Sequence, residues 1–332
     1  MREAEFWRPL QNGRVECLLC PNSCVIAPEK RGRCRVRSNR AGRLVANGYG
    51  MVVSAANDPI EKKPLYHFLP GSRILSVGCN GCNLSCIFCQ NWEISQQDVP
   101  SRYISPEELA TLGSVDGSKG VAFTYSEPLV WYEYILDTAV LLQERGLKVV
   151  LVTNGVINPE PLERLLPLVD AMNIDLKAIN PAFYGKYCGG DFLNTVKNTI
   201  SSAYSAGVHV EVTNLLIPGC NDHPGEVERL AEWVASVSPN IPLHISRFFP
   251  CYQMQNLPPT PLESMYRAFE IAKERLNFVY LGNIRDEESQ TTYCPSCGRA
   301  VIKRGAFFGV RENLLSDGLC PYCGAEIYGV FK

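Results

Sequence analysis

The feature that most constrains the fold is a regular alternation of short apolar segments with longer amphipathic ones through the middle of the chain. Repeated strand–helix units of this size predict a parallel sheet with right-handed crossovers. About six units, rather than eight, indicate an α/β fold of the partial (βα)6 TIM-type barrel class, in which chemistry lies at the C-terminal ends of the strands. The expected strands are 73–77, 121–124, 148–153, 172–176, 208–216, 243–248 and 278–281.

Three of the intervening helices have recognisable starts. Ser105-Pro106 and Thr260-Pro261 each have a glutamate three residues after the hydroxyl side chain, which is the pattern of a capping box. Asn158-Pro159 is a third start, and Asp222 or His223 is expected to begin another helix.

Fifteen cysteines among 332 residues require an explanation. Eleven of them fall into three tight groups. No signal peptide or bilayer-spanning apolar stretch is recognisable in the sequence, so we expect a cytoplasmic protein without membrane contact. In a reducing compartment, metal ligation is a better explanation than disulfides. The groups are Cys17, Cys20, Cys24 and Cys34; Cys82, Cys86 and Cys89; and Cys294, Cys297, Cys320 and Cys323.

The middle group follows the first expected strand directly, with the spacing CxxxCxxC at Cys82, Cys86 and Cys89. A 4Fe–4S cluster with three protein thiolates keeps one iron open, and that iron can bind the amino and carboxylate groups of S-adenosylmethionine (SAM). The nearby Cys79 is expected to be a spectator, because a fourth thiolate would close the open iron. The spacing and its place after a strand resemble the radical SAM superfamily over about residues 70–285.

This resemblance implies cofactor-binding residues after the next three strands. Glu127 stands where the superfamily contacts the SAM amino group, although the usual glycine pair is replaced here; its alternative role is a helix N-cap. Thr153 and Asn154 resemble the turn that contacts the ribose. Asp175 and Lys177 resemble a segment of glycyl-radical-enzyme activases that holds a cation beside SAM. Those activases carry an additional Asp where this chain has Val152, and a buried ion pair is the alternative for Asp175 and Lys177.

Longer motifs at 58–68, 244–250 and 280–283 resemble one narrower family, the radical SAM protein of the AmmeMemoRadiSam system, which is similar to pyruvate formate-lyase activating enzyme. The resemblance implies that His244, Arg247 and Asn283 also bind cofactor or substrate; a rim pair of His244 and Arg247 is the alternative. We expect Glu61 to His67 to pack the N-terminal module against the barrel.

The outer cysteine groups predict two further metal sites. Cys294, Cys297, Cys320 and Cys323 form twin CPxCG knuckles, typical of a zinc ribbon. Cys17, Cys20, Cys24 and Cys34 suit either zinc or a second iron–sulfur cluster. The expected domains are an N-terminal cysteine-rich module with its connector, 1–69; the radical SAM partial barrel, 70–288; and the zinc ribbon, 289–332.

The function expected from this resemblance is reductive cleavage of SAM to a 5′-deoxyadenosyl radical that abstracts hydrogen from a substrate, such as a glycyl site on a protein. Radical modification of a small molecule or a nucleotide or RNA substrate is the alternative, and a non-enzymatic iron–sulfur scaffold is a rival of another class. Expected partners are a one-electron donor of the flavodoxin or ferredoxin type and Memo-like and AMMECR-like proteins. The run of basic residues from Lys30 to Arg43 further favours a polyanionic or acidic protein substrate, with intramolecular pairing as the alternative.

Overall fold

The centre of the protein is an open, nine-stranded, mostly parallel sheet. The computed structural model describes residues 2–305 and 309–332. Each expected strand is present within two or three residues at either end, and the seven are paired in parallel. They are β8 (Arg73–Cys79), β10 (Ser118–Phe123), β11 (Lys148–Thr153), β12 (Ala171–Asp175), β13 (His209–Leu216), β14 (Leu243–Arg247) and β15 (Val279–Gly282).

Two further strands at one edge were not expected. β7 (Met51–Pro59) pairs antiparallel with β8, and the short β9 (Arg102–Tyr103) pairs antiparallel with β7. The sheet order is β15-β14-β13-β12-β11-β10-β8-β7-β9, so β15 and β9 are its edges. β7 lies within the segment 1–69, and that segment therefore contributes a strand to the central sheet.

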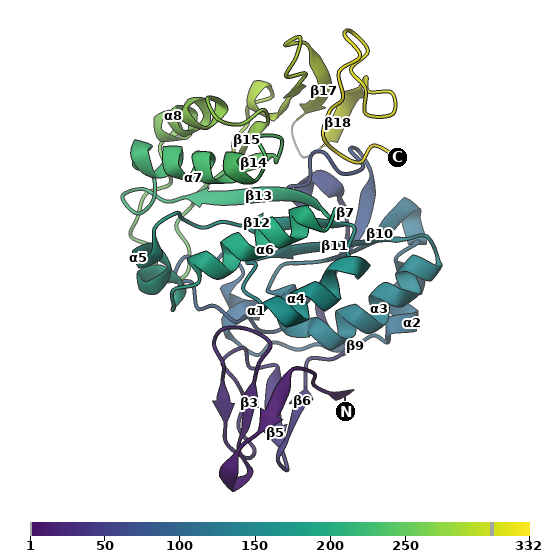
Figure 1. Cartoon of the computed structure of the whole chain (residues 1–332), viewed down its shortest axis with the longest axis vertical. Helices are drawn as coiled ribbons and strands as arrows, with labels where there is room; N and C mark the ends of the chain where they lie inside the picture. Colours follow the sequence, from purple (N-terminus) through teal and green to yellow (C-terminus); the bar gives the residue numbers. More distant parts are fainter. Residues whose placement is uncertain (1, 306–308) are drawn as a thin grey trace.

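Helices cross between the parallel strands (Figure 1). They are α1 (Trp92–Gln96), α2 (Pro106–Leu112), α3 (Tyr132–Glu144), α4 (Pro159–Leu165), α5 (Pro181–Phe183), α6 (Leu193–Ser205), α7 (Pro224–Val237) and α8 (Leu262–Lys273). The short turns are η1 (Gln11–Gly13), η2 (Ile60–Lys62), η3 (Val115–Gly117), η4 (Pro128–Trp131), η5 (Leu166–Leu168), the π-turn η6 (Tyr184–Cys188) and η7 (Glu288–Gln290).

Three expected helix starts are confirmed, at Ser105, at Asn158 before α4 and at His223 before α7, and the capping box at Thr260 is wrong. Ser105 caps α2 by accepting a hydrogen bond from the Glu108 backbone N at 3.2 Å. Thr260 does not cap α8, whose N-cap is Pro261. Instead the Thr260 hydroxyl is buried, donates to the Leu216 carbonyl at 2.5 Å and accepts from the Phe248 N at 3.1 Å. It therefore ties together the ends of two strands.

The N-terminal module protrudes at one end of the molecule (Figure 1). It consists of two small antiparallel sheets, β1 (Arg2–Glu3) with β6 (Arg43–Ala46) and β5 (Arg37–Arg40), and β2 (Trp7–Pro9) with β3 (Val15–Cys17) and β4 (Val25–Ile26). Arg37 and Glu133 of α3 form an ion pair in which both side chains are only 1% exposed. This buried pair joins the module to the main body.

We expect Arg37→Met to lower the free energy of unfolding by roughly 3–5 kcal/mol, because it leaves the Glu133 carboxylate buried without its partner charge. The double variant Arg37→Met/Glu133→Gln should recover most of that loss. Urea unfolding of samples matched for metal content measures both. Equal losses in the two variants would contradict this account of the pair.

The C-terminal segment contains β16 (Thr292–Tyr293), β17 (Ala300–Gly305) and β18 (Gly309–Asn313). The guanidinium of Arg304, 1% exposed, donates to the Tyr66 carbonyl at 2.6 Å and lies 4.2 Å from the Tyr66 ring centre. The His67 ring contacts the Tyr280 hydroxyl and the Tyr328 carbonyl, both at 2.6 Å. The connector around residues 61–67 thus packs against the central sheet, as expected, and against the C-terminal segment, while no hydrogen bond described for it reaches the N-terminal module.

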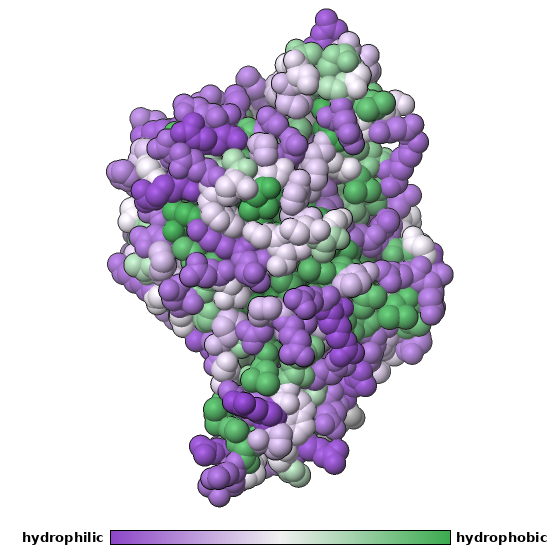
Figure 2. All heavy atoms as spheres, viewed as in Figure 1, coloured by the Kyte–Doolittle hydropathy of each residue, from purple (hydrophilic) through white to green (hydrophobic). Residues whose placement is uncertain are grey.

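No helix in the described ranges is long and apolar enough to cross a bilayer. On the face shown in Figure 2, apolar side chains gather in small groups separated by polar ones.

Candidate functional site

A large cleft lies at the C-terminal ends of the parallel strands. It encloses about 1800 Å³ of space, part of which is open to solvent. Cys82, Cys86 and Cys89 line it together with residues that lie in or directly after β10, β11, β12, β14 and β15. The strand ends therefore bring together motifs separated by two hundred residues of sequence.

The loop that carries the three cysteines is held by backbone hydrogen bonds to the π-turn η6. Ser85 N donates to the Cys188 carbonyl at 3.1 Å, and Ile87 N donates to the Tyr187 carbonyl at 3.0 Å. Gly81 adopts a left-handed φ of +94°, and a β-carbon there would collide with the Cys34 carbonyl. Glycine is required at this position because the loop passes so close to the N-terminal module.

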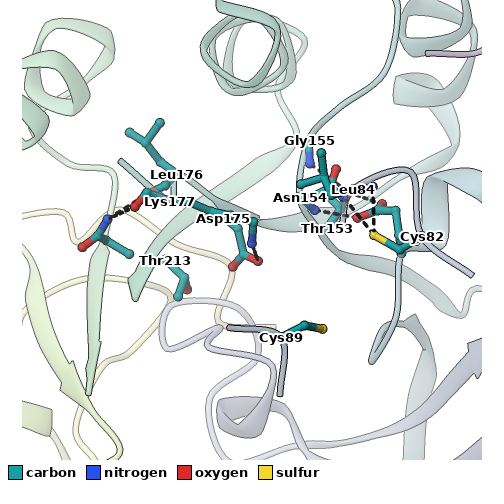
Figure 3. Close-up of polar contacts among 12 residues, drawn as sticks. Cys82, Leu84, Cys89, Thr153, Asn154, Gly155, Asp175, Leu176, Lys177 and Thr213 are labelled. Atoms are coloured by element: carbon teal, nitrogen blue, oxygen red, sulfur yellow. Dashed lines mark hydrogen bonds and ion pairs between the residues drawn. The ribbon is translucent and has the colours of Figure 1, made fainter. Parts of the chain in front are cut away.

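The Thr153-Asn154-Gly155 turn contacts this loop directly, as Figure 3 shows. The Asn154 amide donates to Asn83 Oδ1 at 2.8 Å and to Cys82 Sγ at 3.6 Å. Asn154 N donates to the Glu127 carboxylate at 2.8 Å, and the Thr153 hydroxyl donates to it at 2.5 Å. The turn after β11 is thereby fixed against both the cysteine loop and the segment after β10.

Glu127 lines the cleft, but its carboxylate is already used within the chain. It caps η4 by accepting from Leu129 N at 3.0 Å, in addition to the bonds from Thr153 and Asn154. Burial raises the pKa of this carboxyl to about 7, although these hydrogen bonds act in the opposite direction. The N-cap role is thus present, and contact with the SAM amino group remains a prediction.

The place of the absent glycine pair is taken by Tyr125, which has a left-handed φ of +69°. Its hydroxyl donates to Asp58 at 2.8 Å, and the ammonium of Lys63, 2.8 Å from the same carboxylate, lies over its ring. Burial alone would raise the pKa of Asp58, but the hydrogen bonds from Lys63, Lys62 and Tyr125 lower it to about 2. This cluster, from the segment before β8, was not expected from the sequence.

Asp175 and Lys177 form an ion pair on the far side of the cleft in Figure 3, with 2.7 Å between Lys177 Nζ and Asp175 Oδ2. Both line the cleft, together with Val152. Burial alone would lower the pKa of Lys177, but the charge of Asp175 raises it well above its ordinary value. The ammonium of Lys177 thus supplies positive charge to the cleft.

His244 of β14 and Asn283 after β15 line the cleft, whereas Arg247 is not among its described lining residues. The Arg247 Nε donates to the Thr260 carbonyl at 2.7 Å, and its guanidinium lies over the Phe249 ring. The structure therefore brings two of these three expected residues to the cleft. It also does not form the alternative pair of His244 with Arg247.

The partner of His244 is Glu211, a residue that sequence reasoning missed. Glu211 is fully buried and contacts His244 Nε2 at 2.6 Å and His209 Nε2 at 3.0 Å. It also accepts hydrogen bonds from the backbone N of Tyr66 and His67. Burial alone would raise its pKa, but the hydrogen bonds with His209 and His244 lower it well below its ordinary value. The sequence offered one indication of this contact: side chains alternate along a strand, so His209 and Glu211 lie on the same face of β13.

Cys79 does not join the three cysteines of the cleft. It is buried, with its sulfur 3.5 Å from Ser126 Oγ, and it is absent from the described lining. This placement agrees with a spectator role.

The C-terminal cysteines form a compact cluster. The sulfurs of Cys294, Cys297, Cys320 and Cys323 all lie within 4.8 Å of one another. Such a spacing suits four thiolates around one tetrahedral ion.

We expect the purified protein to contain one tightly bound zinc at this cluster. The variant Cys297→Ser/Cys323→Ser should lose it, as measured by metal analysis, because two thiolates no longer close the tetrahedron. Retention of zinc in that variant, or iron in its place, would contradict the assignment.

The N-terminal cysteines Cys17, Cys20, Cys24 and Cys34 line one small pocket. The basic run around them is largely paired within the chain. Asp98 pairs with Arg31 and Arg35; Glu29 pairs with Arg40; and Glu3 pairs with Arg43. Intramolecular pairing accounts for these charges, and a polyanionic or acidic protein partner stays a prediction.

Three similarities to known proteins bear on the site. The family model of the radical SAM superfamily matches residues 76–234. An uncharacterised protein of Methanocaldococcus jannaschii is 43% identical over 98% of this chain and 99% of its own length. The pyruvate formate-lyase-activating enzyme of Clostridium pasteurianum is 26% identical over 51% of this chain and 71% of that enzyme.

Among solved structures, a radical SAM methyltransferase from Sphaerobacter thermophilus superposes with a TM-score of 0.51. The alignment covers 70% of this chain and 71% of that chain at 16% sequence identity. At this identity the likeness concerns the fold alone.

Proposed function

Since this chain belongs to the radical SAM superfamily and is an enzyme, we propose that Cys82, Cys86 and Cys89 hold a 4Fe–4S cluster that binds SAM. The bound cluster supplies one electron, which splits SAM into methionine and a 5′-deoxyadenosyl radical, and this radical abstracts hydrogen from a substrate. We also propose a cytoplasmic location, because the fifteen free cysteines need a reducing compartment.

The observation that carries this proposal is that three thiols line one cleft, while Cys188, whose side chain is hydrogen-bonded to Cys86, stays outside the described lining. Among the described residues, the cleft lining contains no cysteine besides these three. The site also fits an anionic cluster, because Leu84 N donates to Cys82 Sγ at 3.3 Å and Ser95 Oγ lies 3.2 Å from Cys89 Sγ. Such hydrogen bonds stabilise thiolates and influence the cluster potential.

In this proposal the residues that would hold SAM come from the cysteine loop and the ends of β11 and β12. Asn154 and Thr153 would orient its ribose, and the ammonium of Lys177, held by Asp175, would neutralise its carboxylate. Glu127 acts mainly by fixing the Asn154 turn, since its oxygens already accept three hydrogen bonds. We keep His244 and Asn283 as contacts to SAM or substrate, and we no longer assign Arg247 to the cleft.

The part of the cleft that β14 and the end of β15 line is the proposed substrate site. His244 is oriented there by the buried carboxylate of Glu211, and Tyr66 and Asn283 line the same region. A fixed imidazole beside an open cleft can hold a polar substrate group or exchange a proton with it. We propose an activase-like reaction on a protein site, in line with the Clostridium pasteurianum relative. A small molecule or nucleotide is the second candidate, and a non-enzymatic scaffold is not retained.

The proposed partners follow from this chemistry. The cluster requires a one-electron donor of the flavodoxin or ferredoxin type, and the Memo-like and AMMECR-like proteins remain proposed partners. We keep the partial barrel of residues 70–288 as the catalytic unit, between the cysteine-rich module and the proposed zinc ribbon.

The test is 5′-deoxyadenosine formation by anaerobically reconstituted, dithionite-reduced protein supplied with SAM. Radical SAM activity predicts SAM-dependent product even without substrate, and a stimulated rate when the substrate is present. Peptides and nucleotides added in parallel distinguish the two substrate classes. A protein with an intact cluster that forms no 5′-deoxyadenosine would refute the proposed function.

A further inference from the structure

We propose that Cys17, Cys20, Cys24 and Cys34 hold a second 4Fe–4S cluster, and not zinc, and that this cluster exchanges electrons with the catalytic one. The identity of the cluster stands on its own, and the electron exchange rests on the proposed function.

The four thiols converge from different loops of the N-terminal module onto one pocket. Cys17 ends β3, Cys20 and Cys24 lie between β3 and β4, and Cys34 precedes β5. A hydrogen bond of 3.0 Å from Cys17 N to the Cys24 carbonyl closes the first three into one turn. Leu19, Ile26 and Val130 form an apolar part of the pocket wall, which shields a cluster from water.

Three of the four sulfurs receive a hydrogen bond from nitrogen. Arg33 N donates to Cys24 Sγ at 3.4 Å, the Asn22 amide donates to Cys20 Sγ at 3.6 Å, and Arg37 Nη1 donates to Cys17 Sγ at 3.6 Å. These donors favour thiolates over thiols.

Arg37 gives the clearest indication of what fills the pocket. Its side chain is 1% exposed and lines the pocket, and its Nε has no hydrogen-bond partner. A buried, charged donor without an acceptor is costly. The inorganic sulfides of a 4Fe–4S cluster bound in this pocket would be hydrogen-bond acceptors for Arg37, whereas a zinc ion offers none.

The spacing of the sulfurs also differs from that of the C-terminal cluster. Cys294 and Cys323 lie 3.6 Å apart, and Cys297 and Cys320 lie 3.8 Å apart, as around a single ion. Within the described residues, no three of the N-terminal thiols gather within the 4.8 Å that the C-terminal four share. Wider spacing is expected where each thiolate binds a different iron of a cube.

The N-terminal pocket borders the catalytic cysteine loop. Asn83, the neighbour of Cys82, is part of the pocket wall, and its carbonyl accepts the Asn22 amide at 2.8 Å. The same Asn22 amide is bonded to Cys20 Sγ. On the other side, Asn83 and Cys82 share the Asn154 amide as donor. A short path of hydrogen bonds therefore connects the two sets of sulfurs.

The electron balance is simple. An external one-electron reductant reduces each cluster once and is oxidised in turn. The catalytic cluster gives its electron to the sulfonium of SAM, the C5′–S bond breaks, and the radical formed takes a hydrogen atom from substrate or buffer. The second cluster then returns the catalytic cluster to its reduced state and is itself oxidised.

The first experiment measures metal content. The variant Cys82→Ala/Cys86→Ala/Cys89→Ala, reconstituted anaerobically, should retain about four irons and four sulfides, against about eight of each in the wild type. Its dithionite-reduced electron paramagnetic resonance spectrum should show a cluster signal that SAM does not alter. Zinc and no iron at the N-terminal site of this variant would overturn the proposal.

The second experiment counts electrons. Fully reduced wild-type protein, freed of reductant and mixed with excess SAM, should form about two 5′-deoxyadenosines per chain, because each reduced 4Fe–4S cluster supplies one electron. The matched variant Cys20→Ala/Cys24→Ala should form about one.

Each outcome of this count is decisive. About one product per wild-type chain, with the second cluster still reduced, would overturn the exchange. No product at all, with both clusters present, would refute the proposed function and leave the second cluster in place. If the matched variant does not fold, the wild-type count alone decides.

Discussion

Replacing Cys86 by alanine is expected to reduce SAM-dependent 5′-deoxyadenosine formation to background, a loss of at least about 1000-fold. Cys86 lines the cleft together with Cys82 and Cys89, and the loop that holds them is tied to η6 by backbone hydrogen bonds. Without one of three thiolates, the cube loses an iron ligand and does not assemble stably. Cys82→Ala and Cys89→Ala should behave alike in iron content and in the product assay.

Cys79→Ala is the matched control, because Cys79 lies three residues before Cys82 and is buried like Cys86. Its sulfur faces Ser126 and the Glu127 carbonyl behind the cleft. We expect this variant to retain the cluster absorbance and most of the product formation. Loss of the cluster in Cys79→Ala, with survival of the cluster in Cys86→Ala, would show that Cys79 is a cluster ligand and Cys86 is not.

Removing residues 289–332 is expected to prevent folding of the remaining chain or to make it markedly unstable. The segment covers Tyr66, Phe278 and Tyr280, each less than 5% exposed, and Arg304 donates to the Tyr66 carbonyl. Burial of each aromatic side chain contributes roughly 1.5–3 kcal/mol. Their joint exposure costs an amount comparable to the whole stability of an ordinary domain, about 5–15 kcal/mol.

The end of the chain adds a second anchor. Val330 N donates to the His67 carbonyl at 2.8 Å, and Leu69 N donates to the Val330 carbonyl at 2.6 Å. Thermal unfolding by circular dichroism measures the effect. The matched variant Cys297→Ser/Cys323→Ser retains these contacts and should be destabilised far less than the truncated chain. A truncated protein that melts like the wild type would show that the segment is an independent appendage.

The sequence predicted the catalytic core well because both of its signals are local. Alternation of apolar strands and amphipathic helices depends on short-range periodicity, and each of the seven expected strands is present. The cysteine spacing likewise lies within one loop, and the motifs after β10, β11 and β12 were expected at the cleft because parallel strands end on one side of a sheet.

The errors occurred where distant segments meet. Thr260 has the local pattern of a cap, but its hydroxyl binds the Leu216 carbonyl across the sheet. Arg247 ends β14 as expected, yet Thr260 and Phe249 hold it outside the described cleft lining. Glu211 is an ordinary strand residue in the sequence, and only its burial beside two histidines shows that it orients His244.

The sequence by itself thus predicted seven parallel strands in their chain order, the open coordination of the proposed cluster and the grouping of eleven cysteines into three sites. Only the tertiary structure decided that residues 61–67 pack against the C-terminal segment, that the basic run is largely neutralised and that Asn83 separates the N-terminal pocket from the cleft. The physical reason is the range of the interactions. Periodicity and ligand spacing act over a few residues, whereas burial and charge pairing depend on which distant surfaces the folded chain brings into contact.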